Sequence, residues 1–340
     1  MASILDVARL AKVSKSTVSR VIRGNGPVDP DTKSRVQAAM DKLDYSPHYF
    51  AQGMRGASTR SIGVLIPDFA NPFYHAVFKG IDEMTRQHGY LNMVCITGED
   101  ADNELTCARE LLARKVAGLI YFTYDQNPAV IDFMVKTAKT TPVIFMDPVL
   151  HDQPVCSVVS NGFEGSRKAT TYLLAKGCRR IGYIRGPTRH WVTRERLQGY
   201  ERALEEAAVE LDRDSVVEGD FHMRSGFEGA RQLMSRQQKP DAIMAATDVM
   251  AIGALRYLLQ AGLRVPEDVS VVGFDNIELT RLVEPSLTTV AQPVMDLGRN
   301  AARLIIANER NKRQPERLML DCELIIRAST DARQPRFAPL

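Results

Sequence analysis

The residues best suited to binding chemistry near the start of the chain are Ser14, Lys15, Ser16, Thr17 and Arg20. Together they offer cationic and hydroxyl hydrogen-bond donors. A lysine can donate to O6 and N7 of guanine in the major groove of DNA, while hydroxyl groups and cations also hold phosphate. This group therefore indicates a polyanionic partner. A solvated surface, or a set of residues that only cap a helix, is the alternative.

A second group of candidate residues follows strand-like runs in the body of the chain. Asn71, Phe73 and Tyr74 come after SIGVLIP, and Asp275 comes at the end of VSVVGFD. Aromatic side chains can stack on a ring, and a carboxylate accepts hydrogen bonds from hydroxyl or N–H groups. These residues predict a small-molecule site. As alternatives, the two polar residues would serve as helix caps and the two aromatic residues as core.

Motifs of catalysis are missing from the sequence. It has no P-loop, no GxSxG elbow and no HExxH, its six histidines lack metal-ligand spacing, and its five cysteines form no CxxC pair. We therefore expect no enzyme, no cofactor and no metal.

Composition and charge are those of an ordinary globular protein with one basic segment. The 340 residues are 44% hydrophobic and 25% charged, as in ordinary globular proteins. No apolar run approaches the roughly 18 residues of a membrane span, and the start lacks the layout of a secretory signal, so we expect a cytoplasmic protein without a membrane partner. Residues 1–60 hold ten Lys/Arg against five Asp/Glu, whereas the rest holds 34 against 36. A basic head on a near-neutral body favours nucleic acid as the partner of the head.

The elements that must position the first group are three short helices. Ser3 and Asp6 fit a capping box before a helix over about 4–11, Ser14 can cap a helix over about 15–22, and Asp29-Pro30 starts a third. Two short helices joined by about three residues are typical of a helix-turn-helix, with the second helix entering the major groove. A three-helix protein-interaction module is the alternative.

The next stretch, SPHYFAQGMRG at 46–56, begins as a helix should, with Ser46 as cap and Pro47 in the first turn. It is about two turns long, which is marginal for a helix in water. Phe50 and Met54 lie four residues apart and would share one face.

From residue 61 onward, short apolar runs alternate with amphipathic segments of helical length. The strand-like runs are SIGVLIP, YLNMVCIT, AGLIYFT, PVIFMD, RRIGYIRG, DAIMAAT and VSVVGF. This alternation predicts an α/β body of doubly wound parallel sheets covered by helices, arranged as two lobes. Ligands of such folds sit at the carboxyl edges of the strands.

The chain resembles the LacI/GalR family of bacterial transcription regulators. The resemblance is carried by DVARLAKVSKSTVSRVI, the YSP hinge and SIGVLIPDFANPFY, and it continues through IGYIRGP, RERLQGYERAL, TDVMAIGAL, VPEDVSVVGFDN and LTTVAQP. It covers nearly the whole chain and implies periplasmic-binding-protein-like lobes joined by three crossing strands. The purine-repressor and catabolite-control branch is the most similar.

This resemblance implies a domain plan. We expect a DNA-binding head at 1–46, a hinge helix and linker at 47–60, a body at 61–330 and a loose tail at 331–340. Within the body, lobe 1 would comprise about 61–160 and 292–322, and lobe 2 about 161–291 and 323–330.

The resemblance also assigns roles in DNA binding. Lys15 and Ser16, with Arg20 beside them, would read base edges, while Ser14, Thr17 and Tyr45 would hold phosphate. Met54 would wedge into a base step of the minor groove in place of the family's usual leucine, and Arg55 would supply charge there. His48 and Gln52 depart from the family pattern of the hinge.

The effector site implied by the resemblance contains Asn71, Phe73, Tyr74 and Asp275 together with Arg196, His190, Phe221 and Thr247. Asp147 and Ser160 fall where the family varies. The basic cluster Arg189, His190, Arg194 and Arg196 suggests an anionic effector, such as a sugar acid or phosphosugar, besides a neutral sugar.

These expectations describe a homodimeric repressor of a near-palindromic operator, controlled by a small molecule bound between the lobes. The sign of the effector's action and the use of a phosphoprotein partner, known among catabolite-control relatives, stay open. A sugar-modifying or carbohydrate-binding protein, with the head serving another interaction, is the alternative function.

Overall fold

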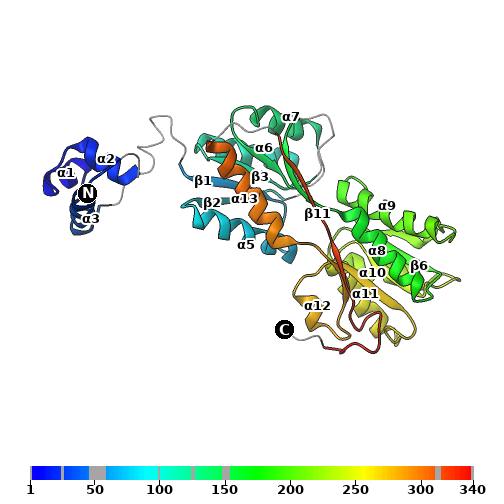
Figure 1. Cartoon of the computed structure of the whole chain (residues 1–340). Helices are drawn as coiled ribbons and strands as arrows, with labels where there is room; N and C mark the ends of the chain where they lie inside the picture. The colour runs from blue at the N-terminus through cyan, green and yellow to red at the C-terminus, as the bar shows by residue number, and fades with distance from the viewer. Residues whose placement is uncertain are drawn as a thin grey trace. The chain divides into compact units, whose positions relative to one another are not determined.

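The structure of the chain is a computed structural model that describes residues 2–23, 27–45, 59–98, 100–123, 127–147, 154–310 and 315–337. It divides into two compact units, Met1–Thr59 and Arg60–Leu340, and each is described by itself (Figure 1). Among the described residues, every helix is too short or too polar to span a lipid bilayer.

The smaller unit is built from three helices, as expected. They are α1 (Ile4–Leu10), α2 (Lys15–Arg23) and α3 (Pro30–Lys42). A capping box starts α1, because the Ser3 hydroxyl accepts the Asp6 N–H and the Asp6 carboxylate accepts the Ser3 N–H. The Asp29 carboxylate caps α3 by accepting the Thr32 N–H at 3.0 Å.

A small apolar core holds the three helices together. Its buried members come from all three helices and the first turn: Val7, Ala8, Ala11, Val18, Val36 and Ala39. The turn between α1 and α2 is short and passes through Lys12 at φ +54°. The two helices therefore form the expected helix-turn-helix.

The larger unit contains two six-stranded sheets. The first runs in the order β11 (Arg317–Leu320), β5 (Cys156–Ser160), β4 (Val143–Phe145), β3 (Gly118–Tyr121), β1 (Ser61–Ile66), β2 (Leu91–Ile96). The second runs in the order β12 (Glu323–Ile325), β10 (Thr288–Ala291), β9 (Ser270–Asp275), β8 (Ala242–Ala245), β6 (Ile181–Arg185), β7 (Val216–Glu218). Every strand pair is parallel except β10 with β12.

Helices cover both faces of the first sheet, which forms lobe 1. On one face, α5 (Pro72–Gln87) and α13 (Val294–Arg310) pack on Ile62, Val64 and Ile66 of β1. On the other face, α6 (Ala101–Ala113) and α7 (Pro128–Thr137) pack on Leu65 and Leu119. Since β1 is buried on both sides, it reads as a continuous apolar run rather than an alternating one.

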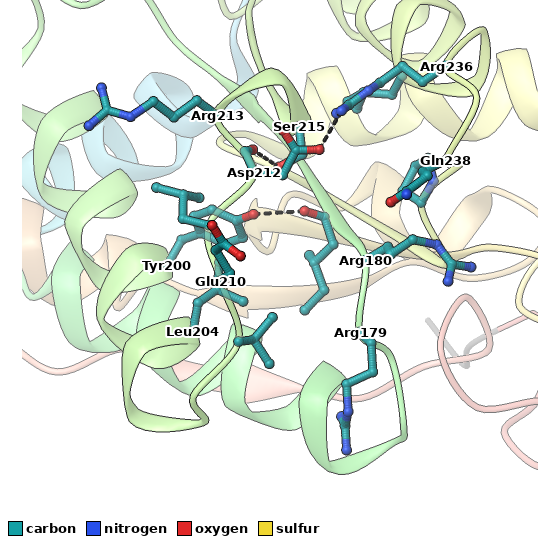
Figure 2. A pocket seen from close by; sticks show the side chains of 15 residues that line it. Arg179, Arg180, Tyr200, Leu204, Glu210, Asp212, Arg213, Ser215, Arg236 and Gln238 are labelled. Carbon is teal, nitrogen blue, oxygen red and sulfur yellow. Dashed lines mark hydrogen bonds and ion pairs between the residues drawn. The ribbon is translucent and has the colours of Figure 1, made fainter.

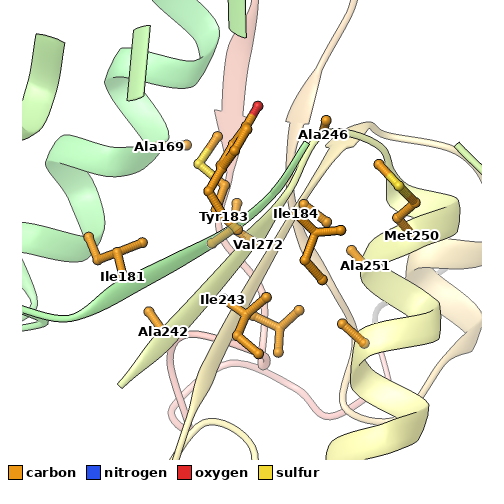
Figure 3. Packing of buried hydrophobic residues seen from close by; sticks show 14 of the residues in the cluster. Ala169, Ile181, Tyr183, Ile184, Ala242, Ile243, Ala246, Met250, Ala251 and Val272 are labelled. Carbon is orange, nitrogen blue, oxygen red and sulfur yellow. The ribbon is translucent and has the colours of Figure 1, made fainter. Parts of the chain in front are cut away.

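The second sheet, which forms lobe 2, is layered in the same way. The helices on its two faces are α8 (Gly162–Ala175) with α9 (Trp191–Glu206), and α10 (Met223–Met234) with α11 (Asp248–Gln260). Tyr183 of β6 stacks on Tyr200 of α9, while the next residue, Ile184, points to the opposite face beside Met250 and Ala251 (Figure 3). Two short helices, a 3-10 helix at Arg213–Ser215 and α12 (Leu279–Leu282), complete the lobe. The predicted α/β fold with two parallel-sheet lobes is confirmed.

The chain passes between the two lobes three times: after β5, after β10, and between β11 and β12. The last of these passages is drawn in red and orange beside β11 in Figure 1. Each lobe is therefore assembled from segments that are separated in the sequence.

The segment after residue 330 is less loose than the sequence suggests. Ser286 donates its N–H to the Arg336 carbonyl at 2.7 Å and its hydroxyl to the Pro335 carbonyl at 2.9 Å. Arg336 also lies 3.4 Å from the Glu284 carboxylate. The expectation of a loose tail is therefore wrong as far as Arg336, because these backbone bonds tie it to lobe 2.

Candidate functional site

The exposed surface of α2 carries the polar residues singled out in the sequence. Lys15, Ser16 and Arg20 are exposed, whereas Val18 on the opposite side of the helix is fully buried. Ser16 and Arg20 are four residues apart and lie on one face. The helix therefore presents a basic and hydroxyl-bearing surface of the size that a major groove admits.

The start of α2 is held by hydroxyl groups. The Ser14 hydroxyl accepts the Thr17 N–H at 3.1 Å and lies 2.7 Å from the Ser16 hydroxyl and 2.8 Å from that of Thr17. A capped helix start with neighbouring hydroxyls is also an anion site. Tyr45 packs, half-buried, against the core of the head. Met54 and Arg55, assigned to the minor groove, lie outside the described residues.

A cavity of about 90 Å³ lies between the two lobes, at the carboxyl ends of their strands. All eight residues assigned to the effector site line it: Asn71, Phe73, Tyr74, His190, Arg196, Phe221, Thr247 and Asp275. It also contains residues that the sequence did not single out, Phe122, Thr123, Met146, Val159, Val192, Glu195, Gln292 and Leu297, as well as Asp147 and Ser160.

An arginine and an aspartate form the charged centre of this cleft. Arg196 Nη1 lies 3.7 Å from Asp275 Oδ1, and both side chains are buried. The guanidinium stacks on the Phe274 ring at 3.8 Å and donates to the Ala246 carbonyl. Asp275 has φ +121° and carries no helix-cap bond, so the alternative that it is only a cap is wrong. A buried ion pair is stable only when each of its charges is compensated. Here Asp275, the last residue of β9, compensates the guanidinium of Arg196 on α9.

Gln292 connects this pair to the crossing strands. Its amide donates to Asp275 Oδ1 at 2.6 Å, and its carbonyl accepts the Ser160 hydroxyl. Gln292 directly follows β10, so the rule that ligands gather at strand ends could have found it. The sequence interpretation missed it because the two residues it joins come from different lobes.

Several buried polar atoms in or beside the cleft have no hydrogen-bond partner among the described residues. They are Arg196 Nε, Asp275 Oδ2 and Thr193 Oγ1. Leaving a buried donor or acceptor unpaired costs about 1–3 kcal/mol. Arg196 and Asp275, which both line the cavity, thus keep one donor and one acceptor for a ligand that offers both.

Carboxylic acids outnumber cations around the cavity. Asp147, Glu195 and Asp275 line it with the single guanidinium of Arg196. Burial raises the pKa of Asp147 to about 7, although the Thr123 N–H and Arg196 act in the other direction. Burial likewise raises the pKa of Glu195 and of Asp275.

Aromatic rings form the remaining walls. Tyr74 meets Phe73 and Phe122 edge to face, at 5.3 and 5.4 Å between ring centres. His190 meets Phe221 in the same way at 5.2 Å. Burial, with a smaller contribution from Arg189, lowers the pKa of His190 to about 4, so its ring is neutral at neutral pH.

Asn71 and Thr247 do act as helix caps. The Asn71 carbonyl oxygen accepts the Phe73 N–H at 3.0 Å at the start of α5, and the Thr247 hydroxyl accepts the Met250 N–H at 3.3 Å at the start of α11. Both residues also line the cavity, so capping and facing the ligand are compatible at these positions.

Only half of the basic cluster lines the cleft, namely Arg196 and His190, whose ring is neutral at neutral pH. Arg189 and Arg194 are exposed and do not line the cavity, and Arg194 lies over the Trp191 ring instead, 5.3 Å from its centre. Residues two apart on a helix point in different directions, so Arg194 and Arg196 of α9 cannot both face the same cavity. The suggestion of an anionic effector loses its basis. No group of three metal-ligating side chains lies together within the described ranges.

Comparison with known proteins identifies both parts of the chain. Residues 3–48 match the model of bacterial regulatory proteins, lacI family, and residues 170–330 match a periplasmic binding protein-like domain. The transcriptional repressor PurR of Vibrio vulnificus (strain CMCP6) is 34% identical over 328 residues, covering 96% of this chain and 98% of its own. The repressor CytR of Escherichia coli (strain K12) is 33% identical and covers 97% of both chains. The chain belongs to the lacI family.

Solved structures of the lacI family show the same architecture. The Lac repressor dimer bound to operator and an anti-inducer has a TM-score of 0.87 with 29% identity, covering 97% of this chain and 99% of that one. A complex of the regulator CelR with cellobiose has a TM-score of 0.75 with 32% identity, covering 97% and 100%. As a member of the lacI family, the protein is a DNA-binding transcription regulator controlled by an effector in its binding-protein-like domain. It is not an enzyme.

Proposed function

We propose that the effector is a neutral molecule with a ring and neighbouring hydroxyl groups, of which a sugar is the representative case. The observation that carries this proposal is the Arg196–Asp275 pair with its unpartnered Nε and Oδ2 atoms. A hydroxyl group both donates and accepts, so two adjacent hydroxyls can satisfy the guanidinium and the carboxylate at once. The rings of Phe73, Tyr74 and Phe221 supply apolar walls for the ring faces.

Charge argues against an anionic effector. Three carboxylic acids surround the cavity, and its single guanidinium is already paired with Asp275. A phosphate or carboxylate ligand would be repelled by these groups unless they were protonated. The solved relatives bound to cellobiose and to ribose point the same way.

Binding of such an effector requires the lobes to move apart. The cavity of about 90 Å³ is well below the roughly 300–1,000 Å³ of pockets that hold small ligands. We infer that the effector enters an open form and selects a particular spacing of the lobes. Control of DNA binding is then a difference in effector affinity between two states of the body.

For the head, we propose that Lys15 and Ser16, with Arg20, read base edges and that Ser14, Thr17 and Tyr45 hold phosphate. The exposure of Ser14, Lys15, Ser16 and Arg20 and the hydroxyl cluster at the start of α2 support this division. Met54 and Arg55 remain proposed minor-groove residues on the grounds of the sequence alone.

We also propose that the protein acts as a homodimer on a near-palindromic operator. Two of the most exposed large apolar side chains, Leu91 at 70% and Ile96 at 56%, lie on the edge strand β2, and Leu279 and Leu282 of lobe 2 are exposed as well. Exposed apolar groups of this kind mark interaction surfaces. Sedimentation of the full chain should give a dimer, and a monomer at micromolar concentration would contradict the proposal.

The decisive experiment is retardation of the protein's own promoter DNA in the presence of a ligand panel. Neutral pentoses, hexoses, disaccharides and nucleosides would be compared with sugar phosphates and sugar acids, with fluorescence of Trp191, the only tryptophan, reporting binding separately. We expect a neutral member to change operator affinity. Binding confined to the anionic compounds would overturn the proposed effector class, and failure to retard any promoter fragment would overturn operator binding.

A further inference from the structure

A second pocket lies within lobe 2, at the edge of the sheet opposite the effector cleft. Its volume is about 480 Å³, which falls in the usual range for small-molecule sites. It opens where β6 begins at Ile181, whereas the cleft lies beyond the other end of this strand. The two sites are thus separated by the length of β6, about 13 Å at the usual rise per residue.

The floor of this pocket is apolar. Ile181, Leu204 and Leu233 are buried beneath it, and Val209 and Leu211 are half-buried at its side. The nearby polar groups of the floor are already satisfied, since the Tyr200 hydroxyl donates to the Ile181 carbonyl at 2.7 Å (Figure 2). The floor therefore suits a compact apolar group.

The rim carries four arginines, Arg179, Arg180, Arg213 and Arg236, and their guanidinium groups surround the pocket (Figure 2). Two of these side chains already bond to other protein groups. Arg236 pairs with Asp212, and Arg179 donates to the Leu174 and Cys178 carbonyls.

The other two rim arginines keep N–H groups for a ligand. The side chain of Arg213 makes no hydrogen bond or ion pair among the described residues, and the residue is exposed. Arg180 uses only Nε, on the Lys239 carbonyl at 2.8 Å, and its Nη2 lies 3.8 Å from Asp241. That carboxylate already accepts the backbone N–H groups of Arg179 and Arg180.

A single acid opposes these cations. Asp212 is neutralised by Arg236, which leaves Glu210 as the exposed carboxylate on the rim. Within the described part of the chain, the pocket thus combines an apolar floor with the unpaired guanidinium of Arg213 and with that of Arg180, which is bonded only through Nε and lies beside Asp241. Guanidinium matches the geometry of phosphate and binds it through paired hydrogen bonds.

We propose that this pocket binds a small phosphate monoester with a compact apolar body, independently of the effector in the cleft. The body would rest on Ile181, Leu204 and Leu233, and the phosphate would sit at the rim between Arg180 and Arg213. Both arginines are exposed. Arg213 can turn inward without losing a side-chain bond to any described residue, whereas Arg180 would exchange its contacts with Lys239 and Asp241 for the phosphate, and the Arg236–Asp212 pair would stay in place.

The test is calorimetric titration of the full-length protein with phenyl phosphate, which has both recognition features. Inorganic phosphate lacks the apolar body and phenol lacks the charge, so each should bind at least about fivefold more weakly. The double variant Arg180→Ala, Arg213→Ala should weaken phenyl phosphate by at least about fivefold, because two charge-assisted hydrogen-bonding groups are lost. Glu210→Gln should tighten it, because a like charge is removed.

Controls come from the same lobe. Arg202→Ala and Glu205→Gln lie on the exposed side of α9, outside the pocket, and should leave the affinity unchanged. Opposite effects of the arginine and Glu210 variants, with unaltered thermal unfolding, cannot come from a general loss of structure. The proposal is overturned if phenyl phosphate fails to bind at millimolar concentration or binds the double variant equally well. It is also overturned if Arg196→Lys, in the cleft, removes the binding.

Discussion

Individual residues of the cleft show how one side chain serves both folding and recognition. Asn71 and Thr247 cap helices while their side chains line the cavity. Arg196 and Asp275 compensate each other's charge and still keep one unpartnered atom each. The wall that each lobe contributes to the cleft is thus already ordered before a ligand arrives, which lowers the entropy cost of binding.

The first prediction concerns the acid of the cleft with a pKa near neutrality. Burial raises the pKa of Asp147 to about 7 in the folded protein, against about 3.9 when unfolded. The folded state therefore binds more protons between these values, and this group's contribution to the free energy of unfolding falls as pH rises from about 4 to about 7. Asp147→Asn should remove most of this pH dependence. At pH 8 its free energy of unfolding should exceed that of the wild type by roughly 1–2 kcal/mol.

Denaturant unfolding of both proteins at several pH values between 4 and 8 measures this difference. Asp268→Asn is a suitable control, since its exposed carboxyl pairs with Arg264, which holds its pKa at about 2, below this range. Parallel stability profiles for wild type and Asp147→Asn would show that Asp147 ionises at its ordinary pKa.

The second prediction concerns base reading by the head. Lys15→Ala should relax the preference at one base position in each half-site, at a cost of about 1–3 kcal/mol for a direct base contact. Competition binding with a library of operator variants measures it, with Lys33→Ala on α3 as the control. An equal loss of affinity on every sequence would instead assign Lys15 to phosphate.

At the scale of elements, close helix pairs support each lobe. In lobe 1, α5 and α13 approach each other through glycines, because a Cβ at Gly298 would lie 2.1 Å from the Val77 carbonyl and one at Gly80 would lie 2.2 Å from the Met295 carbonyl. Backbone atoms cannot move aside as a flexible side chain can. This pair covers the sheet next to the cleft, so its spacing sets the position of Leu297 in the cavity wall.

The third prediction follows from this contact. Gly298→Ala should push α13 away from α5 and lower the free energy of unfolding by about 1–3 kcal/mol, the usual range for overpacking. Thermal unfolding measures it. Asp296→Ala, on the exposed side of the same helix, should change stability by less than about 0.5 kcal/mol. An unchanged melting temperature for Gly298→Ala would mean that the helices separate at no cost.

Some of the elements could be predicted from the sequence and others could not. Strand β1 and the helices of the head were predictable, because continuous apolar runs and capping residues act over a few neighbours. Strand β7, only three residues long, was not. The role of Gln292 depends on Ser160 and Asp275 meeting across the lobes, and no local pattern encodes that meeting. Arg189 and Arg194 were wrongly grouped with Arg196 because nearness in sequence was taken as nearness in the fold.

At the scale of the whole molecule, the DNA-binding surface and the effector cleft belong to separate compact units that divide between Thr59 and Arg60. In the sequence, the chain runs from one unit to the other shortly after residues 46–56. The short stretch with Phe50 and Met54 is part of that connection. A helix of two turns gains order only with support from a partner, and a minor groove can supply it.

The fourth prediction tests this connection. Met54→Ala should weaken binding to specific operator by roughly tenfold or more and reduce DNA bending, since unstacking a base step needs an apolar wedge. Non-specific affinity should stay nearly unchanged, because it depends on phosphate contacts. Fluorescence anisotropy with specific and random duplexes, together with a bending assay, measures both. Met54→Leu serves as the matched control and should retain binding; equal specific affinity for the alanine variant would remove the wedge role.

The triple passage of the chain between the lobes has a consequence for engineering. Lobe 1 takes its strands from β1–β5 and β11 and is covered by α13, while β12 returns to lobe 2. Cutting the gene at a single point after β5 therefore separates lobe 1 from its edge strand β11 and from α13, which stay with the fragment that forms lobe 2. A hybrid regulator that takes a whole lobe from a relative must therefore take at least two separate stretches of sequence together. The junctions between the two proteins must fit at each of the three passages between the lobes.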